Sequence, residues 1–370
     1  MHAAQQHLHI HLGDAAPGGR VVHINNQRPV QAMRLLEGRT AAQAVQLLPL
    51  LFSLCGHAQL AAARDALRDS LPPMNAAQRR ALHCRVQFET VREHLLQIHR
   101  DWPVLCGAPP NPDDLRQIVC RTDAATADPA ALDALVDWVG YHTMGLPPAE
   151  FLAFDAIDAM RRWARSTVEA AAPRWLDALY GCATALPAIE LPTLESLPPD
   201  SLCTALVADD TLEFVSQPTH AGACLETGPA ARHRDHPLVT AAALHGLLGR
   251  LAARLVDLCT VLVTLRQGDD TAPPPPAAAG LGWVDSARGR LIHHAELDAH
   301  QRIAHYRILA PTEWNSHPQG LAAQLLASIG PGTLETVQKQ ARLVVQTIDP
   351  CVLATLQFTT PQAAPEPAHA

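Results

Sequence analysis

The sequence is poor in aromatic and in charged side chains. Phe, Trp and Tyr make up 4% of its 370 residues, and Asp, Glu, Lys and Arg make up 17%. Because 48% of the residues are apolar, the chain is not disordered as a whole, and its core must be built mainly from Ala, Leu and Val. The formal net charge of −8 lacks the basic surplus of nucleic-acid binders, so we expect no nucleic-acid partner.

Membrane and secretion signals are also missing. The most apolar window, residues 44–63, contains Pro49, Gly56 and His57, a composition that favours a buried helix over a lipid-facing one. The N-terminus has neither the basic start nor the apolar stretch of a secretory signal. Nine irregularly spaced cysteines with no CxxC pair do not indicate a disulfide framework. We therefore expect a cytoplasmic protein with reduced thiols and no membrane partner.

Common catalytic motifs are absent. The chain contains no GxGxxG after a strand, no GxxxxGK[ST], no HExxH and no GxSxG. A local cluster of ligand-type side chains is HxHxH at residues 7–11, which would place three imidazoles on one face of a strand. Such a face is either a site for Zn, Ni or Cu or simply a solvated surface, and the pattern alone favours the latter.

Hydrophobic periodicity predicts a mainly α fold with small β elements. Alternation at 7–12, followed by a turn and the apolar run 21–24, predicts a β-hairpin. Helical spacing recurs at 45–52, with a break expected at Pro49, at 88–98 and at 239–266, where six leucines form one stripe. The Pro-rich composition of 271–280 predicts a loop, and strands are expected again within 281–313.

Six short motifs resemble, in sequence order, those of NiFe-hydrogenase large subunits. They are LEGR at 36–39 with CG at 55–56, ETGPAAR at 226–232, GRLAAR at 249–254, SARG at 286–289, PTEWN at 311–315 and DPC at 349–351. Each motif alone is weak, but their common order indicates homology over most of the chain. The resemblance implies a large-subunit-like helical core. We interpret 1–358 as one domain, with an N-terminal β-hairpin (1–30), a helical core (31–270) and strands with a C-terminal metal-motif segment (281–358), followed by a disordered tail (359–370).

The departures from the family pattern concern its metal ligands. In large subunits four cysteines hold the metals, and two of these bridge nickel to iron. Cys55 and Cys351 match the first cysteine of each pair, whereas Ala58 and Ala354 occupy the second positions, and Gln357 replaces the histidine of the C-terminal motif. Alanine offers no lone pair to a metal, so the resemblance implies neither an active hydrogenase nor a bound nickel.

This combination is similar to hydrogenase accessory proteins of the HupK/HoxV type. The resemblance implies a non-enzymatic maturation scaffold that holds or assembles the Fe(CN)2CO fragment transiently for a NiFe-hydrogenase large subunit. The expected partners are that large subunit, a small HypC-like chaperone and HypD-like assembly proteins. Three other readings stay open: a metal-free large-subunit mimic that binds maturation partners, a divergent hydrogenase, and nickel handling through the His-rich N-terminus.

The site that the resemblance implies has two metal ligands and a surrounding polar set. Cys55 and Cys351 would bind the iron. Arg288 would donate hydrogen bonds to cyanide, although a buried ion pair explains it as well. Thr312 would contact the second cyanide or be a turn hydroxyl. Two acids complete the set: Asp349 would pair with Arg288, tune Cys351 or cap a helix, and Glu93 is either a core acid or, slightly favoured, a surface one.

Overall fold

The computed structural model describes residues 7–16, 19–26, 30–268 and 272–359. Within them the chain is mostly helical, with two small three-stranded sheets, so the fold class predicted from periodicity is confirmed. The tail that we expected to be disordered lies, apart from Thr359, outside the described residues.

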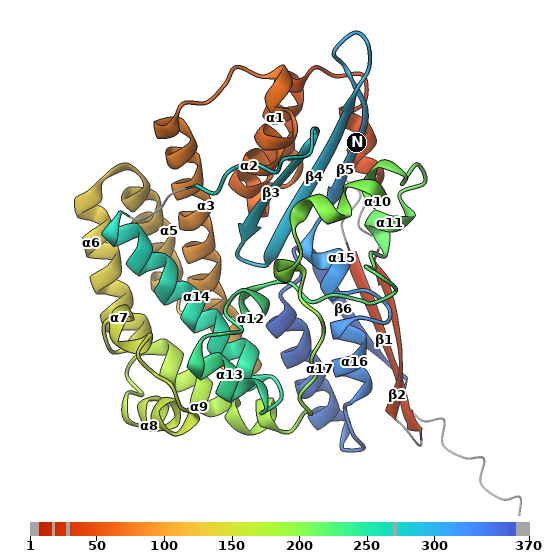
Figure 1. The fold of residues 1–370 in the computed structure, drawn as a ribbon. Coiled ribbons are helices and arrows are strands. Elements are labelled where there is room, and N and C mark those ends of the chain that lie inside the picture. Colours follow the sequence, from red (N-terminus) through yellow and green to blue (C-terminus); the bar gives the residue numbers. More distant parts are fainter. Residues whose placement is uncertain (1–6, 17–18, 27–29, 269–271, 360–370) are drawn as a thin grey trace, which may run out of the picture.

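Most helices form one body beside the two sheets (Figure 1). Thr40 and Asn75 cap the N-termini of α1 and α3 with capping boxes. In each box the cap side chain accepts from the backbone N–H of the third helical residue, and the side chain of that residue accepts from the backbone N–H of the cap. The helices are α1 (Ala41–Leu51), α2 (Gly56–Ala66), α3 (Ala76–Leu96), α4 (Trp102–Leu105), α5 (Pro112–Ala127), α6 (Pro129–Trp138), α7 (Pro148–Phe151), α8 (Ile157–Ser166), α9 (Ala171–Thr184), α10 (Cys203–Val207), α11 (Glu213–Ser216), α12 (Pro229–Arg232), α13 (Pro237–Ala243), α14 (Leu248–Gln267), α15 (Pro311–Asn315), α16 (Leu321–Ala327) and α17 (Leu334–Ile348).

The first sheet is an antiparallel meander of β3 (Leu281–Ser286), β4 (Gly289–Leu297) and β5 (Ile303–Leu309). Helix α2 packs against β3 and β4. The tight turn between β3 and β4 contains only Ala287 and Arg288, and it projects toward the helical body. The sheet therefore carries Arg288 to the boundary between the sheet and the helices.

The second sheet joins the two ends of the chain. Strand β1 (His7–Ala16) pairs antiparallel with β2 (Gly19–Asn26), as the alternation predicted, and parallel with β6 (Leu353–Phe358). Leu8, Ile10 and Leu12 of β1 are buried in the main core. The segment after Cys351 is thus anchored through β1, at the opposite end of the sequence.

The stripe predicted for one helix over 239–266 is interrupted, and this part of the prediction was wrong. Helix α13 ends at Ala243 and α14 begins at Leu248. Between them, Gly246 has a φ of 62°, and its backbone packs against the carbonyl oxygens of Ala183 and Leu186. Leu244, part of the predicted stripe, is 71% exposed, whereas the leucines of α14 are buried. The break expected at Pro49 does not occur there: Pro49 lies inside α1, which continues to Leu51, and the next α-helix, α2, begins at Gly56.

Among the described helices, none combines the length and the apolar character that crossing a membrane requires.

Candidate functional site

Arg288 is held at the centre of the site by two carboxylates. Its side chain is 10% exposed, and Nη2 lies 2.8 Å from Glu93 Oε2 and 3.4 Å from Asp349 Oδ1. The turn that carries it is closed by Ser286, whose hydroxyl donates to the carbonyl oxygen of Gly289 at 2.8 Å. Burial opposes the charge of Arg288, but Asp349 and Glu93 outweigh that effect and raise the pKa of the guanidinium. Arg288 is therefore a fixed buried cation.

The turn that contains Arg288 contacts the ETGPAAR segment so closely that both segments need a glycine at the contact. Gly289 has a φ of 136°, and a Cβ at this position would lie 2.5 Å from Thr227 Oγ1. Gly228, with a φ of 133°, faces the carbonyl oxygen of Arg288 in the same way. Two of the sequence motifs thus meet through backbone contact.

We expect Gly289→Ala to lower the free energy of unfolding by about 1–3 kcal/mol, because alanine is strained at this φ and its methyl group collides with Thr227. Urea unfolding followed by circular dichroism measures the change. Gly181→Ala is the matched control: this glycine lies inside α9 with no atom near its Cβ position, so alanine there should stabilise by about 0.5–1 kcal/mol. Equal effects of the two changes would contradict the close approach at Gly289.

Asp349 links the turn of Arg288 to the helical body. It ends α17 in the left-handed conformation, with a φ of 55°, and its second oxygen lies 3.3 Å from Nη1 of Arg254 on α14. Burial by itself raises the pKa of Asp349, but the positive charges of Arg288 and Arg254 outweigh it and lower the pKa. A carboxylate between two guanidiniums fixes the backbone two residues before Cys351.

Cys351 is half-buried and is hydrogen-bonded to Thr312. The backbone N–H of Cys351 donates to Thr312 Oγ1 at 3.1 Å, and the same oxygen lies 3.1 Å from Cys351 Sγ. Because the oxygen already accepts from the backbone, the hydroxyl hydrogen is available to the sulfur. Arg288 is near enough for its charge to interact with that of a Cys351 thiolate. Thr312 and Arg288 therefore both lie close to the Cys351 sulfur, Thr312 through hydrogen-bond contact and Arg288 through its charge.

Cys55 lies where the chain enters α2, at the N-cap position. Gln59 Nε2 is 3.5 Å from its sulfur. Glu89 of α3 holds this entry in place, since its carboxylate accepts from the backbone N–H groups of His57 at 2.9 Å and Ala58 at 3.2 Å. Glu93 is one helical turn further along α3 than Glu89, so this helix connects the Cys55 turn to Arg288. That the two sulfurs face one cavity stays a prediction.

Glu89 should make stability depend on pH. Burial raises its pKa to about 7, although the hydrogen bonds from His57 and Ala58 oppose the shift. An acid with a raised folded-state pKa contributes stability below its unfolded pKa, near 4.5, and that stability is lost as pH rises through about 7. We expect a loss of about 3 kcal/mol over this interval. Chemical unfolding at a series of pH values measures it, and in Glu89→Gln this contribution should be absent; an unchanged pH profile would contradict the assignment.

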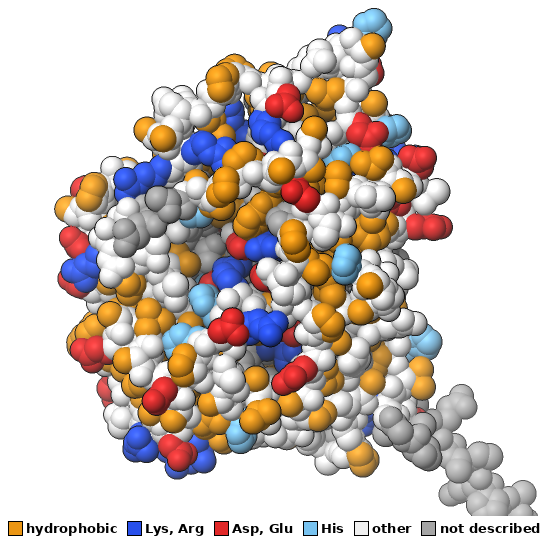
Figure 2. Space-filling model, viewed as in Figure 1, with side chains coloured by type: hydrophobic (Ala, Val, Ile, Leu, Met, Phe, Trp, Pro, Cys, Tyr) orange, Lys and Arg blue, Asp and Glu red, His pale blue; other side chains and the backbone are white. Residues whose placement is uncertain are grey.

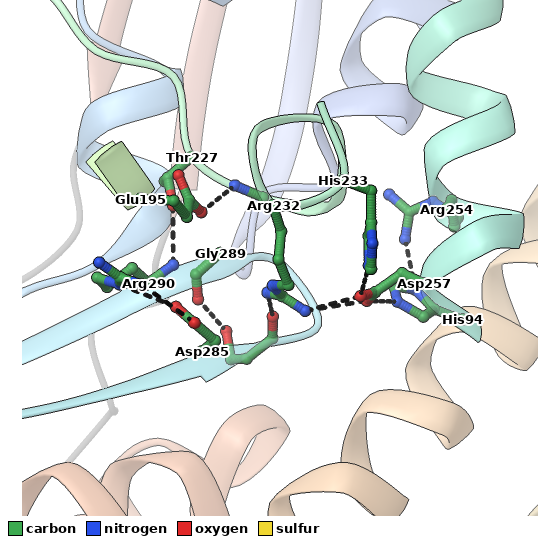
Figure 3. A network of polar contacts seen from close by, with 12 residues as sticks. His94, Glu195, Thr227, Arg232, His233, Arg254, Asp257, Asp285, Gly289 and Arg290 are labelled. Atoms are coloured by element: carbon green, nitrogen blue, oxygen red, sulfur yellow. Dashed lines mark hydrogen bonds and ion pairs between the residues drawn. The ribbon is translucent and has the colours of Figure 1, made fainter. Parts of the chain in front are cut away.

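A second layer of buried charge surrounds Asp257 on α14 (Figure 3). Its carboxylate accepts from Arg232 at 2.9 Å and contacts Nε2 of His233 at 2.6 Å and Nε2 of His94 at 2.7 Å. Burial alone would raise the pKa of Asp257, but Arg232 and the two imidazoles bring it well below the usual value. Arg254 donates to Nδ1 of His94 at 3.1 Å, and burial lowers the pKa of His94, so this imidazole is neutral. This layer supports Arg254, which in turn holds Asp349.

The sequence motifs converge on this place from distant parts of the chain. Arg250 of GRLAAR binds Glu226 of ETGPAAR through two oxygens, at 2.8 and 2.6 Å, and Asn315 of PTEWN binds the backbone of Thr227 at 3.0 and 2.8 Å. A cavity of about 20 Å³, room for one water, lies between Arg250, Arg254 and Arg288; neither cysteine lines it. Figure 2 shows acidic and basic side chains side by side in the middle of this face of the molecule.

The structure brings five of the predicted residues together: Glu93, Arg288, Thr312, Asp349 and Cys351. Glu93 is buried, so the preference for a surface acid was wrong, because the side chain is needed as a partner for Arg288. Sequence reasoning missed Asp257, His94, His233 and Glu89. Of these four, only Glu89 could have been found from local sequence, because it lies one helical turn before Glu93.

Two observations bear on metal binding. Among residues 7–16, 19–26, 30–268 and 272–359, no group of three or more His, Cys, Asp or Glu side chains is arranged to hold one metal ion. Within the same residues, Nε of Arg288 is a buried nitrogen without a hydrogen-bond partner. The second observation, which the Nε atom of Arg232 shares, leaves one donor of the Arg288 guanidinium available to a ligand.

Comparison with known proteins identifies relatives along nearly the whole chain. The sequence is 32% identical to the hydrogenase expression/formation protein HoxV of Cupriavidus necator, over 92% of this chain and 94% of that protein. It is 31% identical to HupK of Rhizobium leguminosarum bv. viciae, over 90% of both chains, and 30% identical to HupK of Azotobacter vinelandii, over 95% of this chain and 97% of that protein. No family model matches the sequence.

Solved structures show the same fold at low sequence identity. A [NiFeSe] hydrogenase variant from Desulfovibrio vulgaris Hildenborough matches with a TM-score of 0.57 and 16% identity, over 91% of this chain and 94% of that one. An NAD+-reducing [NiFe]-hydrogenase matches with a TM-score of 0.52 and 16% identity, over 90% and 93%. The large-subunit-like architecture that the motifs implied is therefore confirmed.

Proposed function

The chain belongs to the family of HoxV- and HupK-type hydrogenase expression/formation proteins, and from this premise we propose that it is a maturation scaffold. In this proposal it holds or assembles the Fe(CN)2CO fragment of a NiFe-hydrogenase large subunit as cargo and catalyses no hydrogen chemistry. The large-subunit-like fold supports the proposal, because such a fold can present the fragment in the surroundings that it meets later.

One observation carries the proposal: Arg288 is a buried guanidinium with an unpartnered Nε, next to Cys351. Bound cyanide is an anionic acceptor, and hydrogen bonds from a charged donor to such an acceptor are strong. Glu93 and Asp349 fix the guanidinium and leave Nε for the cargo. Thr312 would donate a hydrogen bond from its hydroxyl to the Cys351 sulfur or to a second cyanide.

Cys55 and Cys351 are the proposed iron ligands. Soft thiolates suit an iron centre of this kind, and alanine at positions 58 and 354 removes the other two sulfurs of the large-subunit pattern. Two thiolates hold one iron fragment in a way that permits release, whereas four would retain a finished two-metal centre. We expect no nickel at this site for the same reason.

The proposed function requires partners on both sides of the transfer. A small HypC-like chaperone and HypD-like assembly proteins would deliver or build the fragment, and the NiFe-hydrogenase large subunit would receive it. Membership of a hydrogenase expression/formation family supports an association with this machinery.

An infrared spectrum tests the proposal. The full chain is purified without oxygen from cells that express the maturation genes, and from matched cells that lack them. We expect vibrations of metal-bound CN and CO, together with about one iron per chain, in the first preparation only. A spectrum without these bands in both preparations would contradict the scaffold.

The alternative is a metal-free large-subunit mimic that binds maturation partners. The finding that favours it is the lack, among the described residues, of a group of three or more metal-ligand side chains. This function predicts that partners co-purify with the chain while iron and the infrared bands are missing. The same preparation therefore separates the two functions.

A further inference from the structure

The outer face of the β1–β2–β6 sheet carries a row of imidazoles that the maturation site does not use. His7, His9 and His11 alternate with the buried leucine and isoleucine positions of β1 and so share the outward face. His23 of β2 is paired directly with His11 in the antiparallel register and is exposed. Four histidines thus lie on one side of a two-stranded hairpin.

The geometry of His11 and His23 suits a shared cation. Their ring centroids are 6.3 Å apart. Two imidazoles on one divalent cation, each with a metal–nitrogen distance of about 2.0–2.1 Å, have centroids roughly 4–6 Å apart, depending on the angle at the metal. A small change of side-chain torsion therefore brings both nitrogens to one ion without moving the backbone.

Thr359 orients one of the two rings. Its hydroxyl oxygen lies 3.1 Å from Nε2 of His11. When Nε2 donates its hydrogen to this oxygen, Nδ1 carries the lone pair that a metal needs, which is how outer hydrogen bonds select the tautomer of a metal-bound histidine. The backbone N–H of Thr359 also donates to the carbonyl oxygen of Leu12 at 3.0 Å, so the hydroxyl is fixed relative to β1.

We propose that the imidazoles of His11 and His23 form a two-point site for a divalent cation of the Ni²⁺, Cu²⁺ and Zn²⁺ class. Water would complete the coordination shell, and His9 lies on the same face two residues before His11. Neutral imidazole is a preferred ligand for these metals, and affinity should be highest for Cu²⁺ in this series. Because only two side chains are required, the site agrees with the lack of three-residue clusters among the described residues.

The site is linked structurally to the C-terminal motif. His11 faces Gln357 of β6 on its other side, and β6 begins two residues after Cys351. A cation that clamps β1 to β2 would stabilise the sheet in which β6 is a parallel partner. Cation binding at His11 and His23 should therefore slow amide hydrogen exchange in β1 and β2, with a smaller effect in β6.

Calorimetric titration of the untagged, metal-free full chain with NiCl2 tests the proposal. We expect about one Ni²⁺ per chain, with the affinity weakened at least tenfold in His11→Ala and in His23→Ala. The control His245→Ala, an exposed histidine between α13 and α14, should bind like the wild type. If an alanine variant does not fold, the corresponding glutamine variant replaces it.

Two results would overturn the proposal: no Ni²⁺ binding by the wild type, or binding that neither His11→Ala nor His23→Ala weakens. A variant with both Cys55→Ala and Cys351→Ala should bind Ni²⁺ as tightly as the wild type. Because the proposed site uses neither cysteine, failure of one proposal does not affect the other.

Discussion

Replacing either Cys55 or Cys351 by alanine is expected to abolish iron retention and hydrogenase maturation while the chain stays folded. Each cysteine supplies one of the two proposed sulfur ligands, and one thiolate cannot hold the fragment. Both side chains are half-buried, Cys351 at the edge of one apolar cluster and Cys55 at the edge of another, so their loss should cost little stability. Iron per chain is measured on protein purified without oxygen, and maturation as hydrogenase activity in cells in which each variant replaces the natural chain.

Cys84→Ala is the matched control, because Cys84 is also half-buried but lies on α3 outside the resembling motifs. This variant should keep iron and support maturation. If Cys55→Ala and Cys351→Ala retained as much iron as Cys84→Ala, the two cysteines would not be the ligands, and the metal-free mimic would become the better account.

Arg288→Met should lower the free energy of unfolding by about 3–5 kcal/mol, because it leaves the buried carboxylates of Glu93 and Asp349 without their common cation. The change should also alter how the free energy of unfolding decreases at low pH. In the wild type the folded-state pKa of Asp349 is lowered, so its contribution is present above the unfolded pKa and is lost as pH falls through the folded pKa. Without Arg288 this loss should begin at a higher pH. Urea unfolding between pH 3 and pH 7 measures both effects.

Two further variants complete the test: a surface ion-pair control, and a variant that separates the charge of Arg288 from its hydrogen bonds. Arg266→Met removes a surface ion pair with Asp133 and should cost at most about 1 kcal/mol. Arg288→Lys keeps a positive charge but loses the Nε donor, so it should recover stability better than it recovers iron retention. A loss below about 1 kcal/mol in Arg288→Met would show that the buried ion pair does not stabilise the fold.

The fold was predictable where the signal is local. The alternation of polar and apolar residues predicted the β1–β2 hairpin, and helical spacing of apolar residues predicted the buried face of α3. The break between α13 and α14 was not predictable, because it depends on the contact of Gly246 with backbone near residue 186. The parallel pairing of β1 with β6 likewise joins segments that are far apart in sequence and leaves no periodic trace.

The site was predictable only through the resembling motifs. The motifs predicted that Arg288, Thr312 and Asp349 belong to one site. The structure shows what holds them in place: the left-handed conformation of Asp349 at the end of α17, the glycine that follows Arg288 in its turn, and the Thr312 hydroxyl that accepts from the backbone of Cys351. The layer around Asp257 had no comparable signal. His94 and Asp257 come from α3 and α14, and their pairing reflects the packing of these helices rather than any spacing along the chain.

The central claim is that the sulfurs of Cys55 and Cys351 hold one iron. Iron K-edge X-ray absorption of the full chain, purified without oxygen from cells that express the maturation genes, measures the ligands directly. We expect two sulfur atoms per iron at about 2.3 Å, and one sulfur after Cys55→Ala or Cys351→Ala in any iron that remains. An iron with no sulfur neighbour, or with a sulfur shell that neither substitution changes, would contradict this claim.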